Sequence, residues 1–138
     1  MSRTSLHPSL YEPSSETPLL NGTTCSACGL VVFPPVSLGC TKCGAAPEQL
    51  KATPLAAAGT LHSVATIHIH TGKDIEAPFT VAEVKLDSGP LIRALMIKPA
   101  SAGDIGKRVA GQWFVESTSE DGAQNVEPRF VITEEEAV

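Results

Sequence analysis

The chain has 138 residues, enough for one ordinary domain or a small barrel with an appendage, and too few for two enzyme domains. Its longest uncharged apolar stretch, residues 30–38, is interrupted by two prolines and is too short to cross a bilayer. The 10 basic and 15 acidic residues give a net charge of −5, which argues against a protein that binds nucleic-acid phosphates.

Residues 1–24 are predicted to form an extended arm. They contain three prolines among many serines and threonines, and their apolar residues show no helical periodicity. No basic segment precedes an apolar run, so we expect no signal peptide, a cytoplasmic protein and no membrane partner. Tyr11, Leu19 and Leu20 could pack along the chain's own domain or a partner, with disorder as the alternative.

All four cysteines lie between positions 25 and 43, as two Cys-x-x-Cys pairs that are each followed by glycine. Such a turn points two sulfurs at one spot, and the glycine permits the tight backbone that brings N–H groups to the thiolates. The pattern predicts a zinc ribbon at 25–44, with one zinc per chain held by Cys25, Cys28, Cys40 and Cys43. Iron in the same site and disulfide bonds are the alternatives.

Four thiolate ligands would leave the metal no open coordination position. A closed site cannot activate water, so we expect its role to be structural. Four thiolates and one Zn²⁺ add two negative charges, which takes the formal charge from −5 to about −7. This charge strengthens the argument against a nucleic-acid partner.

After the ribbon, residues 45–58 are interpreted as a linker, and residues 59–133 as short strands separated by turns. The predicted strands are 60–70, 79–86, 91–97, 109–116 and 128–133. A hairpin turn at 87–90 joins the second and third strands, and a long loop separates the third from the fourth. This order predicts an all-β protein in which a rubredoxin-like zinc ribbon precedes a five-stranded OB-fold barrel, with residues 134–138 as an acidic tail.

Several short motifs stand along the chain in a specific order. They are Cys25-Ser-Ala-Cys28-Gly29, Phe33-Pro34-Pro35, Cys40-Thr-Lys-Cys43-Gly44, Gly59-Thr60-Leu61-His62-Ser63, Ala77-Pro78-Phe79-Thr80-Val81-Ala82, Leu86-Asp87-Ser88-Gly89-Pro90, Ile105-Gly106-Lys107-Arg108-Val109 and Pro128-Arg129-Phe130. Together they resemble the acyl-CoA-associated zinc-ribbon and OB-fold family, over residues 25 to about 132.

The resemblance implies a small subunit that accompanies a thiolase-type enzyme acting on CoA thioesters. Members of this family resemble accessory chains of thiolases, of hydroxymethylglutaryl-CoA synthase assemblies and of steroid side-chain aldolases. The short arm looks most like the small subunits of thiolases in aromatic degradation, such as the one that cleaves benzoylsuccinyl-CoA. Thiolase chemistry needs a cysteine nucleophile, and all four cysteines here are assigned to metal, so we expect a non-catalytic subunit.

Four residues are candidates for contact with CoA. An acidic protein that binds CoA must concentrate cations locally, and Arg93, Lys107 and Arg108 are the best candidates for its phosphates. Phe33, with the two prolines that follow it, could form a ledge for the adenine or pantetheine, or pack inside the ribbon.

Two strand patterns have both a functional and a structural interpretation. Alternation would place His62, His68 and His70 on one face. They could form a second metal site, with Asp74 or Glu76 as a further ligand, or a polar strand surface that faces solvent or a ligand. Trp113 and Phe114 would point to opposite faces, one to the core and the other to a partner or ligand.

Two other classes of function compete with the accessory subunit. A nucleic-acid-binding OB protein is disfavoured by the charge and by only 4 Phe, 1 Trp and 1 Tyr available for stacking on bases. An autonomous enzyme, such as an acyl-CoA hydratase, would use a histidine and a carboxylate on the barrel.

Overall fold

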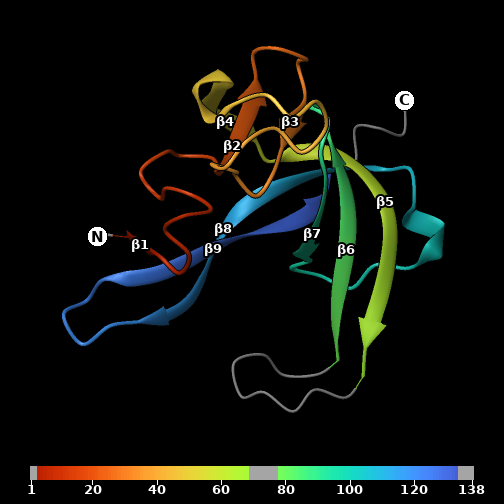
Figure 1. Ribbon diagram of the computed structural model, residues 1–138. Coiled ribbons are helices and arrows are strands. Elements are labelled where there is room, and N and C mark those ends of the chain that lie inside the picture. Colours follow the sequence, from red (N-terminus) through yellow and green to blue (C-terminus); the bar gives the residue numbers. More distant parts are fainter. Residues whose placement is uncertain (1–2, 69–77, 134–138) are drawn as a thin grey trace.

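A computed structural model describes residues 3–68 and 78–133, which form strands, short 3-10 helices and loops (Figure 1). The strands are β1 (Arg3–Ser5), β2 (Leu19–Cys25), β3 (Val31–Val32), β4 (Leu50–Ala56), β5 (Ala58–Ile67), β6 (Phe79–Leu86), β7 (Leu91–Leu95), β8 (Arg108–Thr118) and β9 (Gln124–Ile132). The 3-10 helices are η1 (Pro47–Gln49) and η2 (Ala102–Asp104). Within the described residues there is no α-helix, and no helix long and apolar enough to cross a membrane.

The smaller sheet is the ribbon, which lies at the top of the view in Figure 1. Its strand order is β3-β2-β4, and both pairings are antiparallel. β2 and β4 pair along their whole length, from Leu19 opposite Ala56 to Cys25 opposite Leu50. The ladder therefore runs from the barrel directly to the first metal-ligand cysteine.

The larger sheet has the order β1-β9-β8-β5-β6-β7 and contains the five barrel strands, β5 to β9. β5 pairs with both β6 and β8, as the first strand of an OB fold does. A parallel bridge between Met96 and Phe130, with a hydrogen bond of 2.9 Å from the Ile97 N–H to the Phe130 carbonyl, brings the end of β7 to β9. These contacts close the barrel, and the predicted fold class is confirmed.

The core fills the barrel with alternate residues from each strand. Leu61, Val84, Val109 and Phe130 are each at most 1% exposed. Leu20 and Leu55, opposite each other on the ribbon strands, belong to the same buried cluster. The end of the ribbon sheet that lies nearest the barrel is thus part of the barrel's core.

The N-terminal arm lies along its own domain, one of the alternatives expected from the sequence. β1 adds to β9 in parallel, and the Trp113 indole N–H donates a 2.9 Å hydrogen bond to the Ser15 carbonyl. The Arg3 guanidinium lies 5.4 Å from the centre of the Trp113 ring system. Trp113 therefore anchors the arm, while Phe114 lies on another part of the surface.

The interpretation of residues 45–58 as a patternless linker is wrong, because this segment contains η1 and β4. Two prolines suggested a break in structure, but Pro54 lies on an edge strand, where a missing N–H removes no ladder hydrogen bond. The strand predicted at 128–133 begins earlier, at Gln124, and the one predicted at 60–70 begins at Ala58. The second predicted strand, 79–86, has the predicted limits.

Candidate functional site

The two cysteine turns have the geometry expected of metal knuckles. The N–H of Gly29 donates to the Cys25 carbonyl at 2.8 Å, and the N–H of Gly44 donates to the Cys40 carbonyl at 3.0 Å. Both glycines have positive φ, 83° and 78°, a conformation that residues with a Cβ rarely adopt. The glycine that follows each pair is therefore required for the turn.

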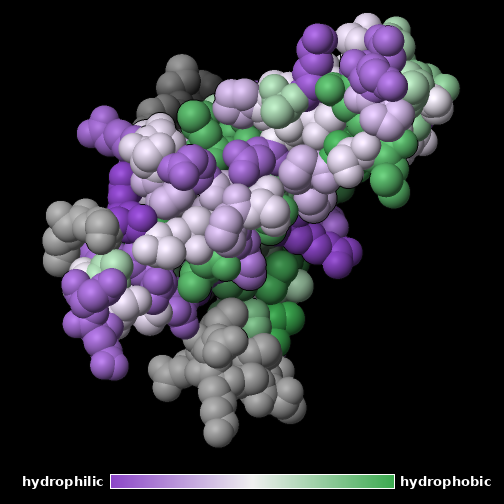
Figure 2. Space-filling model, turned by 60° about the vertical axis from the view of Figure 1, so that its left-hand side comes forward, coloured by the Kyte–Doolittle hydropathy of each residue, from purple (hydrophilic) through white to green (hydrophobic). Residues whose placement is uncertain are grey.

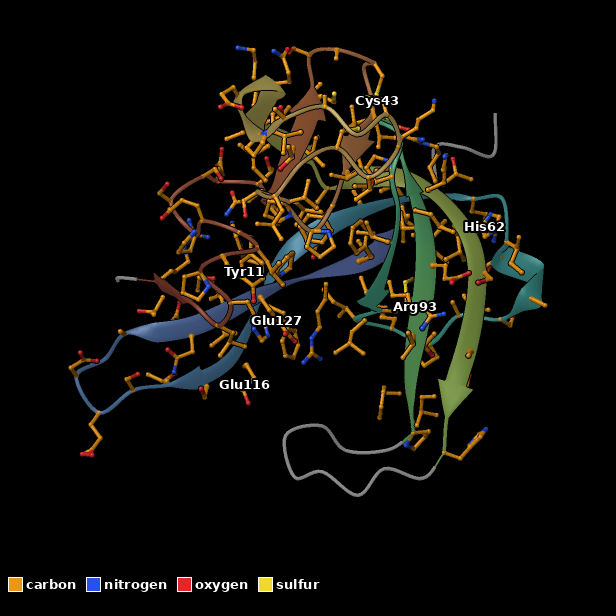
Figure 3. All side chains as sticks on the ribbon, in the orientation of Figure 1. Tyr11, Cys43, His62, Arg93, Glu116 and Glu127 are labelled. Atoms are coloured by element: carbon orange, nitrogen blue, oxygen red, sulfur yellow. The ribbon has the colours of Figure 1, made fainter. Side chains whose placement is uncertain are left out.

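The four cysteine sulfurs converge at the tip of the ribbon, where Figure 3 labels Cys43. All four Sγ atoms lie within 4.8 Å of one another, with 3.7 Å between Cys25 and Cys43 and 3.6 Å between Cys28 and Cys40. Sulfurs about 2.3 Å from a shared tetrahedral ion lie about 3.8 Å apart, whereas a disulfide bond is about 2.05 Å long. The distances fit four ligands around one metal and do not fit disulfides.

Backbone groups prepare one sulfur to be a thiolate. The N–H groups of Cys43 and Lys42 both lie 3.4 Å from the Cys40 Sγ, and they lower the pKa of that thiol to about 6. At Cys43 a backbone hydrogen bond with Ala45 lowers the pKa, but partial desolvation and hydrogen bonds with the other three cysteines outweigh it and raise the pKa to about 12. Four thiolates this close together require a cation, which a bound metal supplies.

The four cysteines would fill every coordination position of a tetrahedral metal ion. Cys25 and Cys40 are buried and Cys28 and Cys43 are exposed, and together they supply all the ligands that a tetrahedral ion accepts. A metal held here would tie β2 and β3 to the turn that precedes η1. Its chemistry would be structural, because no position remains for water or substrate.

The three cations proposed for CoA phosphates each lie on a carboxylate. Arg108 donates two hydrogen bonds to Asp87, at 2.8 and 2.6 Å, and Lys107 donates one to Asp104 at 2.9 Å. Arg93 contacts Glu83 at 3.2 Å. The Arg108 hydrogen bonds lower the pKa of Asp87, so this carboxylate remains charged and paired at neutral pH.

The structure brings these candidates together only in pairs. Arg93 and Phe33 line one cleft of about 230 Å³ between the arm, the ribbon and β7, together with the buried Tyr11. The Tyr11 hydroxyl has no hydrogen bond of normal geometry there, and burial followed by the charge of Glu127 raises its pKa to about 12. Lys107 and Arg108 lie near η2 and the β6–β7 turn and do not line this cleft.

A β-bulge in β5 prevents His62 and His68 from lying on one face of the strand, where alternation would place them. The register of β5 with β6 shifts between Leu61 and Ser63, which moves His62 out of step with the residues beyond it. His62 lies beside Glu83, on the outside of β5, while His68 lines a cleft at the other end of the strand (Figure 3). His70, Asp74 and Glu76 lie outside the described residues.

A second group of charged residues, absent from the predicted site, lines the same cleft as His68. Arg129 pairs with Glu127 and lies over the Phe114 ring, and Lys98 lies at the rim. The only signal in the sequence is the alternation of Glu127 and Arg129 along β9. Their contact with Phe114 depends on the β8–β9 register, which the sequence does not state.

The fold and the cysteine site together define a zinc-ribbon and OB-fold protein. Residues 20–48 match the family described as ChsH2, rubredoxin-like zinc ribbon domain. Among solved structures, the chain is similar to one described as "Ltp2-ChsH2(DUF35) aldolase", with 24% identity, a TM-score of 0.62, and coverage of 81% of this chain and 83% of that chain. No curated protein gives a significant match.

These findings confirm the resemblance to a zinc-ribbon and OB-fold family. The ribbon is supported by its own family match, and the combination of ribbon and barrel by the structural likeness. At 24% identity that likeness describes the fold.

Proposed function

We propose that this protein is a non-catalytic subunit of a complex that acts on acyl-CoA thioesters, and that it docks on a thiolase-type catalytic subunit. The metal ion is zinc, and it shapes the ribbon without taking part in the reaction. The reaction is carbon–carbon cleavage, in aromatic degradation, as in the thiolysis of benzoylsuccinyl-CoA.

The observation that carries this proposal is the commitment of every cysteine in the chain to one site. Thiolytic cleavage forms an acyl-enzyme on a cysteine thiolate, so a chain that performed it would need a fifth cysteine. The four Sγ atoms lie within 4.8 Å of one another, and a thiolate bound to a structural metal is not available as a nucleophile. The nucleophile must come from another chain.

The structural likeness supports a complex of this kind. The similar structure is described as an aldolase named for two components, Ltp2 and ChsH2(DUF35), and the likeness extends over most of both chains. An aldolase and a thiolase both break a carbon–carbon bond.

Among the described residues, the large hydrophobic side chains that are exposed do not form a single apolar face for docking. The large hydrophobic side chains that are exposed, Leu38, Leu91, Ile105 and Val115, lie on different segments. In Figure 2 the hydrophobic groups of one face likewise form several separate patches among polar ones. Leu38, which is 93% exposed on the loop between the cysteine pairs, is the strongest candidate for a partner contact.

The test is reconstitution with a candidate thiolase-type subunit. Cleavage of benzoylsuccinyl-CoA is measured for the chain alone, for the partner alone and for the mixture, with co-purification as a separate readout of docking. We expect no turnover by the chain alone, turnover by the mixture, and loss of that turnover when the partner's nucleophilic cysteine is replaced. Turnover by the purified chain alone would refute the proposal.

The matched variants are Leu38→Ser and Leu91→Ser. Both remove an exposed leucine, but from different regions, so loss of co-purification in one alone would locate the docking surface. The proposal predicts that neither variant changes the zinc content.

A further inference from the structure

A cleft of about 430 Å³ lies at the end of the barrel where β5 ends and β6 begins, away from the ribbon in the view of Figure 1. We call it the barrel cleft. Its apolar lining includes Phe79, Met96, Ile97 and Phe114. None of the four cysteines and none of the four residues predicted to contact CoA lines it, whereas His68, considered from the sequence for a second metal site, does.

One cation of the barrel cleft is fixed in position before any ligand arrives. The Arg129 Nε donates a 2.6 Å hydrogen bond to Glu127, and the guanidinium carbon lies 3.8 Å from the centre of the Phe114 ring. These side chains are well covered, since Arg129 is 11% exposed and Glu127 18%. The arrangement follows from the strand register, which places Phe114 directly opposite Glu127.

The hydrogen bond to Glu127 uses only one of the N–H donor groups of Arg129. Within residues 3–68 and 78–133, its Nη1 and Nη2 atoms donate no hydrogen bond, although its Nε does. A planar guanidinium presents these two terminal nitrogens as a fork that matches the two oxygens of a carboxylate. Because Phe114 and Glu127 already order the side chain, little conformational entropy is lost when the fork binds an anion.

Lys98 and Glu116, two other charged residues of the described lining, affect which ligands the barrel cleft can accept. Lys98 is exposed at the rim and forms no ion pair within the described part of the chain, unlike Arg93, Lys107 and Arg108. Glu116 also lines the cleft and would repel a group with two negative charges. The lining therefore suits a single negative charge attached to an apolar body.

We propose that the barrel cleft binds a small organic carboxylate, with the carboxylate held by Arg129 and Lys98 and the apolar body packed against Phe79, Met96 and Phe114. All the residues of the described lining belong to one chain, and the site goes beyond the proposed accessory function. It requires neither the catalytic partner nor CoA.

The test uses 3-phenylpropanoate as the probe and the full zinc-loaded chain. Binding is followed by NMR shifts of the backbone amides, and we expect saturable shifts at Phe79, Ile97 and Arg129. Arg129→Gln should weaken binding about tenfold or more, because it removes a charge-assisted pair of hydrogen bonds. Lys98→Gln should weaken it about threefold, as expected for a more exposed charge.

The control variant is Arg93→Gln, which removes the same charge from an arginine that is 79% exposed and lies outside the barrel cleft. It should leave the affinity unchanged. The control ligand is 3-phenylpropanamide, which has the same ring but no charge and should bind at least about tenfold more weakly.

Three results would overturn the proposal: equal binding of the amide and the carboxylate, an equal loss of affinity in Arg93→Gln and Arg129→Gln, or binding of inorganic phosphate but not of the carboxylate. If Arg129→Gln fails to fold, Lys98→Gln still decides the question, because Lys98 is exposed and holds no other part of the described structure. Unchanged affinity in Lys98→Gln would then count against the site.

Discussion

The ribbon and the barrel are held together by different forces, although both are small β-sheet structures. The barrel has a continuous core in which Leu61, Val84 and Phe130 are at most 1% exposed. The tip of the ribbon has only the two-residue strand β3 and a long loop, and four sulfurs occupy the place of a core. A segment this small cannot bury enough apolar surface to be stable without a metal.

The ribbon and the barrel nevertheless share part of one hydrophobic core. Leu20 and Leu55, each 2% exposed, belong to the barrel's cluster although they lie on ribbon strands. One end of β2 is therefore stabilised by hydrophobic burial at Leu20, and the other end by metal coordination at Cys25. The comparison predicts that the ribbon unfolds from its tip, and that the part nearest the barrel remains folded.

The largest expected effect is loss of the metal. Cys40→Ser, or chelation of the metal from the parent chain, should unfold the tip of the ribbon, because metal binding supplies the folding energy of such a site. Hydrogen exchange should show loss of protection at Cys25 and Leu50 and retention at Leu61 and Val84. Metal analysis should find about one zinc per parent chain.

Equal protection of the ribbon tip in the chelated and zinc-loaded chains would contradict this comparison. Thr41→Ser is a matched control, since it changes a neighbouring residue between the ligands Cys40 and Cys43 but leaves both sulfurs in place. It should keep both the zinc and the protection.

A smaller effect, confined to the barrel, is expected from Gly59→Ala. A Cβ at this position would collide with the backbone carbonyl of Lys85 on the neighbouring strand, and backbone atoms cannot move aside as a flexible side chain can. We expect a loss of about 1–3 kcal/mol in the free energy of unfolding, the usual cost of overpacking. Urea denaturation measures it, and the zinc content should not change.

Gly103→Ala is the control for this substitution. The nearest atom to a Cβ there is the Ser101 Oγ at 3.8 Å, an ordinary contact, and the φ angle of Gly103 is not positive. Its unfolding free energy should stay within about 0.5 kcal/mol of the parent's. If Gly59→Ala were equally harmless, the close approach of β5 and β6 would not matter to the barrel.

The same contrast explains which features could be predicted from the sequence. The cysteine turns are local, since their spacing and the following glycines determine the geometry, and the four sulfurs do lie within 4.8 Å of one another. The turn residues that separate the short runs predict the barrel strands, and 79–86 has the predicted limits. Features that depend only on neighbouring residues, such as the cysteine turns, can therefore be predicted without knowing the fold.

Features that depend on pairing could not be predicted in this way. The bulge at His62 and the contact of Arg129 with Phe114 exist only in a particular strand register. β4 was missed because Pro54 reads as a strand breaker unless the strand is known to lie at an edge. The proposed CoA cations were chosen by charge alone, and their partners, such as Asp87, are found only once the hairpins are aligned.

The smallest effect concerns the ion pair between Arg108 and Asp87, which joins the start of β8 to the β6–β7 turn. The Arg108 hydrogen bonds lower the pKa of Asp87 in the folded chain, so the pair stabilises the fold above the ordinary aspartate pKa of about 3.9 and this contribution is lost as the pH falls below it. The side chains are 38% and 57% exposed, so solvent screening limits the contribution to about 0.5 kcal/mol. Asp87→Asn should therefore lower the free energy of unfolding slightly at pH 7, and less in high salt.

The difference between variant and parent should disappear in acid. The control is Glu120→Gln, which changes an exposed residue without an ion pair in the described part of the chain and should show no difference at either pH. A difference for Asp87→Asn that persisted unchanged in acid would show that Asp87 acts through the turn's backbone rather than through its charge.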